Sequence, residues 1–356
     1  MSHCLGATGA GYVWPPLILS CDGEAMRLTM HASQEPLGVS PVRYLERMDT
    51  VVPATAFERG VDAFVAVVLA RLDTLGLKDT DLAALWGEVS RERNDPDLTR
   101  TRRLEALLGI DPDEADNGLV ERAARYDQDL GTGAVDELAA VAKDEVLPAL
   151  EAARLGRGRQ TTKVQLADRE ELARQFQRLN RREQSAWQVG EALAARGRRL
   201  WSLGDAPIDN KRLADIADAP ATFLTDDQAV DIGTALDGAG FREGGGGTAF
   251  RAMIRSPWPT NRRFQLARLF ADDLISGGGD TLLPVTRGKT VRQKLQRAFA
   301  AELLCPSAAL RHMLPTAPDD DDLERVARHF EVSPLLVRTT LVNKGVLPRE
   351  RLTEPV

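Results

Sequence analysis

Apolar residues recur at helical spacing in two neighbouring stretches between residues 262 and 306. The first stretch carries Phe264, Leu266, Ala267, Leu269, Phe270 and Leu274, and the second carries Leu295, Ala298, Phe299, Ala301, Leu303 and Leu304. Such wide stripes with a period of 3.6 residues are typical of helices that pack into a core. The pattern therefore predicts two buried helices joined by a glycine-rich connection.

The N-terminal region has a different pattern, in which two short apolar runs flank a group of turn residues. Leu17 to Ser20 and Met26 to Met30 are predicted strands, and Cys21-Asp22-Gly23-Glu24 has the chemistry of a hairpin turn. From Val51 to Leu150 the apolar spacing becomes helical, with Trp86 and the phenylalanines expected in the core. This region is predicted to form a β-hairpin followed by a helical lobe.

A third short strand is predicted at Phe250 to Ile254, directly before the first core helix. The four glycines from Gly244 to Gly247 lack the lysine and hydroxyl residues of a phosphate-binding loop, so a flexible hairpin loop is the preferred interpretation. Together these elements predict a fold that is mainly α with small β elements (α+β).

The stretch from Asp319 onwards has the pattern of a helix-turn-helix pair. Its first apolar face comprises Leu323, Val326, Ala327 and Phe330, and its second comprises Leu336, Val337, Leu341 and Val342. The second helix would contact DNA if it presented Arg338, Thr339 and Lys344 outward. The alternative is a helical pair that serves only to pack against the preceding domain.

Two segments in the C-terminal half resemble the paired helices of the ImmA/IrrE family of zinc metallopeptidases: RFQLARLFADDLI and RAFAAELLCP. The resemblance spans residues 190 to 347 and implies a peptidase-type domain. In that family the first helix carries an H-E-x-x-H motif and the second supplies a glutamate ligand. The corresponding positions here are Arg268, Leu269 and Asp272 in the first helix and Leu295 in the second.

A zinc site needs two imidazoles one helical turn apart, a third ligand and a carboxylate that takes a proton from the bound water. Arg268, Leu269, Asp272 and Leu295 supply none of these, so the resemblance implies the scaffold without the metal. We therefore expect no catalytic residue, metal or other cofactor. At these vestigial positions Arg268 and Asp272 are expected to form an ion pair one turn apart.

Charge is unevenly distributed along a chain whose net charge is −7. Residues 154–199 contain twelve Lys or Arg against five Asp or Glu, which indicates either a solvated basic face or a patch for a partner or an anion. The candidate residues of that patch are Arg174, Arg178, Arg181, Arg182, Arg198 and Arg199. The overall negative charge argues against a protein that coats nucleic acid.

The three cysteines form no C-x-x-C motif and are odd in number, so neither a disulfide framework nor a cysteine zinc site is implied. No apolar window is long enough for a membrane span, and no signal peptide is apparent. These features predict a cytoplasmic protein without a membrane partner.

Four segments are predicted: a small β element at 1–48, a helical domain at 49–155, a degenerate ImmA/IrrE-like peptidase domain at 156–318 and the helix-turn-helix-like unit at 319–356. The leading functional hypothesis is a non-catalytic regulatory or antitoxin-like module that binds a protein partner such as a repressor or toxin. The family resemblance implies a setting in stress response, toxin–antitoxin systems, mobile elements or phage defence. The alternatives are a transcriptional regulator that binds DNA, and a peptidase whose metal site is non-standard or completed by a partner.

Overall fold

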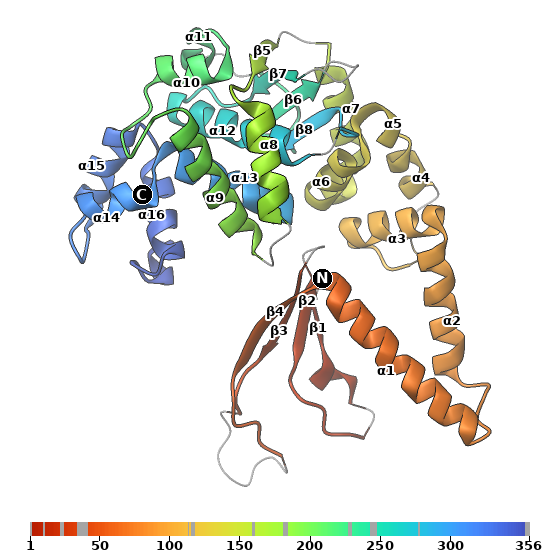
Figure 1. The fold of residues 1–356 in the computed structure, drawn as a ribbon. Helices are drawn as coiled ribbons and strands as arrows, with labels where there is room; N and C mark the ends of the chain where they lie inside the picture. The colour runs from red at the N-terminus through yellow and green to blue at the C-terminus, as the bar shows by residue number, and fades with distance from the viewer. Residues whose placement is uncertain are drawn as a thin grey trace. The chain divides into compact units, whose positions relative to one another are not determined.

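The computed structural model describes residues 2–9, 11–21, 25–33, 42–112, 114, 118–158, 161–180, 184–226, 230–242, 248–276 and 278–352. The chain divides into two compact units, residues 1–114 and residues 115–356. Helices predominate and the strands form two small antiparallel sheets, which confirms the predicted fold class (Figure 1). The predicted segment boundaries at residues 48, 155 and 318 stay predictions.

The first unit begins with a four-stranded antiparallel sheet whose strands follow sequence order. These strands are β1 (Ser2–Cys4), β2 (Ile18–Cys21), β3 (Ala25–Met30) and β4 (Met48–Pro53), with a short 3-10 helix, η1 (Leu5–Thr8), after β1. The predicted hairpin is confirmed because β2 pairs with β3 in antiparallel register, with Ile18 opposite Thr29. Its turn residues 22–24 lie outside the described part of the chain.

Three helices follow this sheet, namely α1 (Ala54–Thr74), α2 (Asp81–Asn94) and α3 (Pro96–Leu108). The helical pattern predicted from Val51 starts later, because Val51 and Val52 are β-branched, Pro53 cannot donate a backbone hydrogen bond, and all three belong to β4. The side-chain hydroxyl of Thr80 accepts from the Ala83 amide and caps α2.

The predicted apolar stripe of α1 is only partly buried. Val65 is buried, but the Phe64 side chain is 68% exposed, so the expectation that the phenylalanines of this region are core residues is wrong for Phe64. On the neighbouring surface Arg93 of α2 pairs with Asp62 of α1 at 2.9 Å, and its guanidinium lies over the Trp86 ring at 5.3 Å. Polar contacts thus join these two helices.

The second unit opens with short helices and then forms a mixed α/β core. The opening helices are α4 (Leu119–Ala124), α5 (Asp127–Leu130), α6 (Thr132–Ala142), the 3-10 helix η2 (Lys143–Glu145) and α7 (Val146–Gly156). The sheet has the order β5-β7-β6-β8, all antiparallel. Its strands are β5 (Thr162–Gln165), β6 (Gly238–Arg242), β7 (Ala249–Ile254) and β8 (Leu282–Val285).

Strand β7 confirms the strand predicted at Phe250 to Ile254. The glycines from Gly244 to Gly247 lie outside the described residues. Strand β8 differs from the prediction, because it lies within what was expected to be a connection between the two core helices. All four residues of β8 are buried, so this short run is part of the core.

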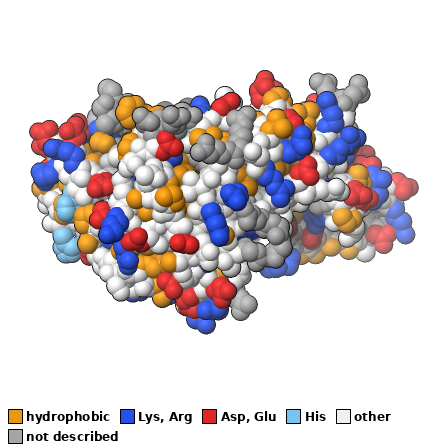
Figure 2. Space-filling model, turned by 90° about the horizontal axis from the view of Figure 1, so that it is seen from above, with side chains coloured by type: hydrophobic (Ala, Val, Ile, Leu, Met, Phe, Trp, Pro, Cys, Tyr) orange, Lys and Arg blue, Asp and Glu red, His pale blue; other side chains and the backbone are white. Residues whose placement is uncertain are grey.

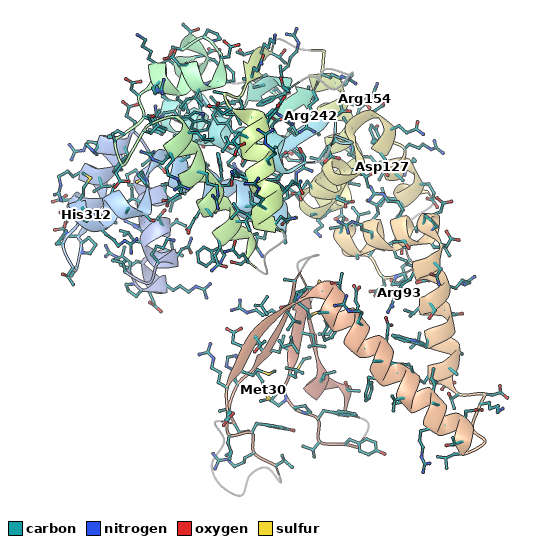
Figure 3. All side chains as sticks on the ribbon, viewed as in Figure 1. Met30, Arg93, Asp127, Arg154, Arg242 and His312 are labelled. Atoms are coloured by element: carbon teal, nitrogen blue, oxygen red, sulfur yellow. The ribbon has the colours of Figure 1, made fainter. Side chains whose placement is uncertain are left out.

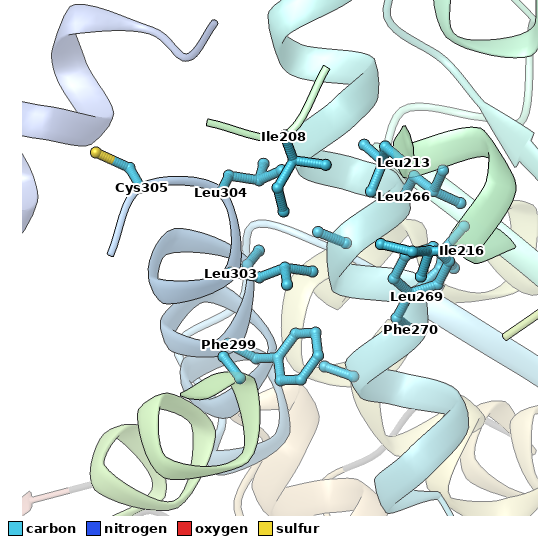
Figure 4. Close-up of a cluster of buried hydrophobic side chains, with 14 of the residues drawn as sticks. Ile208, Leu213, Ile216, Leu266, Leu269, Phe270, Phe299, Leu303, Leu304 and Cys305 are labelled. Atoms are coloured by element: carbon cyan, nitrogen blue, oxygen red, sulfur yellow. The ribbon is translucent and has the colours of Figure 1, made fainter. Parts of the chain in front are cut away.

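Both predicted core helices are present as α12 (Pro259–Ile275) and α13 (Val291–Leu304). Around them are α8 (Arg169–Asn180), α9 (Ala186–Leu200), α10 (Asn210–Ala217) and α11 (Thr222–Thr225). Figure 4 shows Leu266, Leu269 and Phe270 of α12 in the same apolar cluster as Phe299 and Leu303 of α13. The predicted stripes therefore face one continuous core.

The C-terminal helices are α14 (Ser307–Met313), α15 (Asp320–Phe330), α16 (Pro334–Asn343) and the 3-10 helix η3 (Arg349–Leu352). The pair formed by α15 and α16 agrees with the predicted helix-turn-helix pattern, and Glu331 provides the left-handed residue (φ 52°) between the two helices. Among the described helices, none combines the length and the apolar composition that crossing a bilayer requires.

Candidate functional site

The four vestigial zinc-ligand positions all lie in the interior of the second unit. Helix α12 is buried on every side and carries Arg268, Leu269 and Asp272, with Arg268 3% exposed and Asp272 0% exposed. Leu295 is buried on the facing helix α13. The two leucines belong to the apolar core, so the two charged residues determine what this region can do.

Arg268 is held by neutral oxygen acceptors from three elements. Its Nη2 donates to the Thr286 carbonyl oxygen at 2.6 Å and to the Gln293 side-chain oxygen at 2.5 Å, and its Nη1 donates to the Gln265 side-chain oxygen at 3.2 Å. Burial lowers the pKa of Arg268 to about 9. The expected one-turn ion pair with Asp272 is wrong, because Arg268 extends towards the end of β8 and Asp272 has a different partner.

That partner is Arg292 at the start of α13. Its Nε and Nη2 donate to the two carboxylate oxygens of Asp272 at 2.6 and 2.7 Å, and its Nη1 donates to Asp280 at 2.6 Å. Burial by itself would lower the pKa of Arg292, but the charges of Asp272 and Asp280 outweigh burial and raise it. Arg292 therefore neutralises two carboxylates at once, with the bidentate geometry that arginine favours.

The N-terminal end of α6 closes over this ion cluster. The Gly133 amide donates to the Asp280 carboxylate at 3.0 Å, and the Thr281 amide donates to the Leu130 carbonyl at 3.0 Å. Gly131 has a φ of 95°, and a Cβ there would lie 2.4 Å from the Asp280 Cα. Only glycine permits this approach, so the contact between α6 and the loop before β8 is built into the sequence.

Helix α6 makes a second contact with this region, through Glu137. The Thr290 hydroxyl donates to the Glu137 carboxylate of α6 at 2.8 Å. Burial raises the pKa of Glu137, while Arg292 and the Thr290 hydrogen bond oppose that shift. Helix α6 thus contacts both the loop before β8 and the residue that precedes α13.

The neighbouring carboxylate, Asp273, is also bound to arginines. Arg169 at the start of α8 donates to it at 2.6 Å, and Arg242 at the end of β6, which Figure 3 labels, donates to it at 2.9 Å. Arg169 and Arg242 are thereby both anchored to α12. We name the set Arg268, Asp272, Asp273, Asp280 and Arg292, with Glu137, the buried ion network.

The buried ion network has little capacity for metal or acid–base chemistry. Its aspartates accept hydrogen bonds from guanidinium groups, and a guanidinium offers no lone pair to a metal. Within the described ranges, no three His, Cys, Asp or Glu side chains are grouped so that they could hold a metal ion. Two cavities in the described part of the chain, of about 290 and 440 Å³, are lined by residues outside the network.

The predicted basic patch is divided by the fold. Arg174 and Arg178 are exposed on α8, where Arg174 pairs with Glu171 at 2.9 Å, and Arg199 is exposed near the end of α9. Arg181 and Arg182 lie outside the described residues. The assignment of Arg198 to this patch is wrong, because its side chain is buried.

Arg198 serves as a structural donor instead. It donates to the carbonyl oxygens of Gly204 and Ala206 in the loop after α9, and to that of Leu303 in the last turn of α13, where helix carbonyls have no partner within the helix. Burial lowers the pKa of Arg198. An arginine that packs between two helix ends cannot meet a partner at the surface.

The candidate DNA-contacting residues on α16 also lie in positions that differ from the prediction. The prediction that Arg338 points outward is wrong, because its side chain is buried and reaches Asp320 in the first turn of α15 at 3.2 Å. Thr339 is half-buried. Lys344 is exposed, but it pairs with Glu191 of α9 at 2.7 Å and its ammonium lies 5.2 Å from the Trp187 ring centroid.

A surface groove that the sequence did not indicate lies where α10, α12, α15 and α16 meet. Its volume is about 440 Å³, and its lining includes Pro259, Arg263, Glu324, Arg328 and Pro334. Beside these residues in the sequence, Trp258 is 71% exposed and Leu335 is also exposed. We name this surface, with Trp258 and Leu335, the α12–α15 groove. The only sequence signal for it was a tryptophan between two prolines.

No protein-family model, curated protein or solved structure matches this chain. The resemblance to the ImmA/IrrE peptidases therefore depends on the two helical segments alone and stays a prediction.

Proposed function

We propose that this chain is a non-catalytic regulatory or antitoxin-like protein-binding module on a scaffold that resembles a zinc peptidase. The observation that carries the proposal is that Asp272, at one of the vestigial ligand positions, has both carboxylate oxygens bound by Arg292, which also binds Asp280, at 2.6 to 2.7 Å. A carboxylate that already accepts two hydrogen bonds from a guanidinium is not an open ligand for a metal ion. On this proposal the scaffold functions by binding a protein partner at its surface.

The α12–α15 groove is the surface best suited to a protein partner. An exposed tryptophan beside an apolar groove is typical of residues that dominate binding energy at protein interfaces. Glu324 and Arg328 are both exposed, one helical turn apart on α15. The complementary partner segment would insert an apolar side chain into the groove and place a cation opposite Glu324 and a carboxylate opposite Arg328.

The placement of the C-terminal cations favours this reading over DNA recognition. Arg338 is buried against Asp320, and Lys344 is held by Glu191. On the face shown in Figure 2, basic and acidic side chains are interspersed, and no continuous basic surface is visible. Duplex DNA binding depends mainly on cations that reach phosphates, so these positions offer it little support.

The test combines metal analysis with quantitative capture of a partner. The purified chain should contain far less than about one zinc per molecule, and roughly stoichiometric zinc that survives mild chelation would contradict the proposal. Affinity capture from native cells should yield a stoichiometric protein whose binding is lost in Trp258→Ala. The control is Trp14→Ala, which removes another exposed tryptophan of the chain.

Two outcomes of the capture experiment would count against the proposal. Equal loss of the partner in both tryptophan variants would exclude the α12–α15 groove as its binding surface. Capture of duplex DNA in place of a protein, with an affinity that falls steeply as salt increases, would favour the transcriptional alternative.

A further inference from the structure

Helix α1 of the first unit, orange in Figure 1, has a mainly apolar face that is exposed. Gly60, Phe64, Val67, Arg71 and Leu75 recur at the three- and four-residue spacing that keeps side chains on one side of a helix. Phe64, Val67 and Leu75 are 68%, 70% and 56% exposed, and a Cβ built on Gly60 would have no neighbour within 4 Å. We name these five residues the α1 seam.

The contacts that α1 makes within its own unit lie on other sides of the helix. Val65 is buried, and Asp62 pairs with Arg93 of α2 at 2.9 Å. At 3.6 residues per turn, Asp62 lies nearly opposite Gly60 and Phe64. A helix that is apolar on more than one side is normally buried. The α1 seam therefore has the composition of an interface that another element covers.

The order of side chains along the α1 seam is complementary to itself. If two copies of α1 lie antiparallel about a two-fold axis near Val67, this residue meets its own copy. The same axis places Phe64 opposite Arg71 of the second copy, and Gly60 opposite Leu75 of the second copy. A leucine then fills the open space above a glycine, and a guanidinium lies on a phenyl ring.

Arg71 also decides between the two possible directions of the helices. Its side chain forms no ion pair or hydrogen bond with the residues that the structure describes, so it can contact a second copy. A parallel pair would place Arg71 against its own copy, and the two cations would repel each other. The antiparallel pair separates these cations and gives each of them an aromatic face.

We propose that a second copy of this chain covers the α1 seam, so that the protein forms a two-fold symmetric dimer through antiparallel α1 helices. The inference is independent of the buried ion network and of the α12–α15 groove, which both belong to the second unit. Interfaces that bury less than about 1,200 Å² belong to weak or transient complexes. For a seam of one helix we therefore expect a reversible dimer with a Kd of about 1 to 100 µM.

Sedimentation equilibrium of the full chain tests the proposal, because it measures the mass of the particle at each concentration. Between about 1 and 500 µM, a range that brackets the expected Kd, the mass should rise reversibly from one chain to two. Val67→Glu places two carboxylates at the axis and should raise the Kd at least about tenfold. Ala66→Glu is the matched control, because it adds the same charge at the neighbouring exposed position outside the α1 seam. Both positions are exposed, so neither change should disturb the fold, and circular dichroism will check this.

Disulfide cross-linking tests the register and the direction of the pair. With Cys4 and Cys21 replaced by serine, Val67→Cys should oxidise readily to a linked dimer, and Ala66→Cys should do so much more slowly. In the antiparallel pair the two copies of Phe64 lie about 10 Å apart along the helices, since seven residues separate Phe64 from Arg71. That distance is too long for a disulfide, so Phe64→Cys should also cross-link slowly.

Any of three results would overturn the proposal. A chain that remains monomeric at about 500 µM, well above the expected Kd, would leave the α1 seam to a different partner. A dimer that Val67→Glu weakens no more than Ala66→Glu does would form through another surface. Cross-linking of Phe64→Cys as fast as that of Val67→Cys would show a parallel pair.

Discussion

Replacing Arg292 by leucine is the most direct test of the buried ion network. The substitution leaves the Asp272 carboxylate, which is fully buried, without the guanidinium that now donates to both of its oxygens. Removing one partner of a buried ion pair costs about 3 to 5 kcal/mol, mainly because the remaining charge is uncompensated. Asp280 loses one contact as well but keeps the Gly133 amide. We therefore expect a loss of about 3 to 5 kcal/mol in the free energy of unfolding of the second unit.

The matched control is Arg287→Leu, in the loop after β8. The Arg287 side chain is 79% exposed, and its ion pair with Asp237 is longer, at 3.3 Å. Exposed pairs contribute about 0 to 1 kcal/mol, so this variant should unfold close to the wild type. Urea unfolding followed by circular dichroism will give both values from the transition midpoints.

A double variant separates the charge effect from loss of packing. In Arg292→Leu/Asp272→Leu the uncompensated carboxylate is gone, and apolar replacements of buried ion pairs are often neutral or stabilising. The double variant should therefore recover a large part of the stability that Arg292→Leu loses. The reasoning would be refuted if Arg292→Leu cost no more than Arg287→Leu, or if the double variant were the least stable of the three.

Three further predictions concern other parts of the second unit and the cysteines. Burial raises the pKa of Glu137 above its ordinary value of 4.5, so its contribution to stability is complete below pH 4.5 and is lost as the pH rises through the raised pKa. Glu137→Gln should therefore gain stability relative to wild type in urea unfolding as the pH rises above 4.5, and a difference that does not vary with pH would contradict this. Burial, with a smaller effect of a nearby glutamate, raises the pKa of Cys305 to about 12, so a thiol reagent should modify the exposed Cys4 and Cys21 in the native chain and reach Cys305 only after unfolding. Lys344→Ala should cost about 1 kcal/mol or less, because its ion pair is solvent-accessible, and a larger loss in thermal unfolding would show that this contact fixes α16.

The sequence predicted the helices of the core well, because their apolar stripes are long and regular. It did not predict β8, which has only four residues and contains a proline. A run of four apolar residues is too short for its periodicity to distinguish a strand from a helix. Sheet pairing with β6 is what makes the segment extended.

The sequence indicated the candidate site only by what it lacked. Substitution of the zinc-ligand positions was visible, but the partner of Asp272 lies 20 residues away on another helix, and that of Gly133 lies 147 residues away. Such pairs depend on the tertiary fold and leave no local pattern. Arg198 was assigned to the surface from the local excess of basic residues, and Arg338 from the expected polar face of its helix. Their burial follows from acceptors that no local sequence reveals.

The long separation between α6 and its contacts also affects the order in which the chain can fold as it is made. The Gly133 amide binds Asp280, and Glu137 binds Thr290 across 153 residues. Ribosomes add about 5 to 20 residues per second, so α6 waits about 7 to 30 s for these partners to be synthesised. During that interval α6 can pack against its sequence neighbours α5 and α7, but not against β8. A nascent chain that ends before residue 280 therefore leaves the side of α6 that meets β8 uncovered and open to chaperones and proteases.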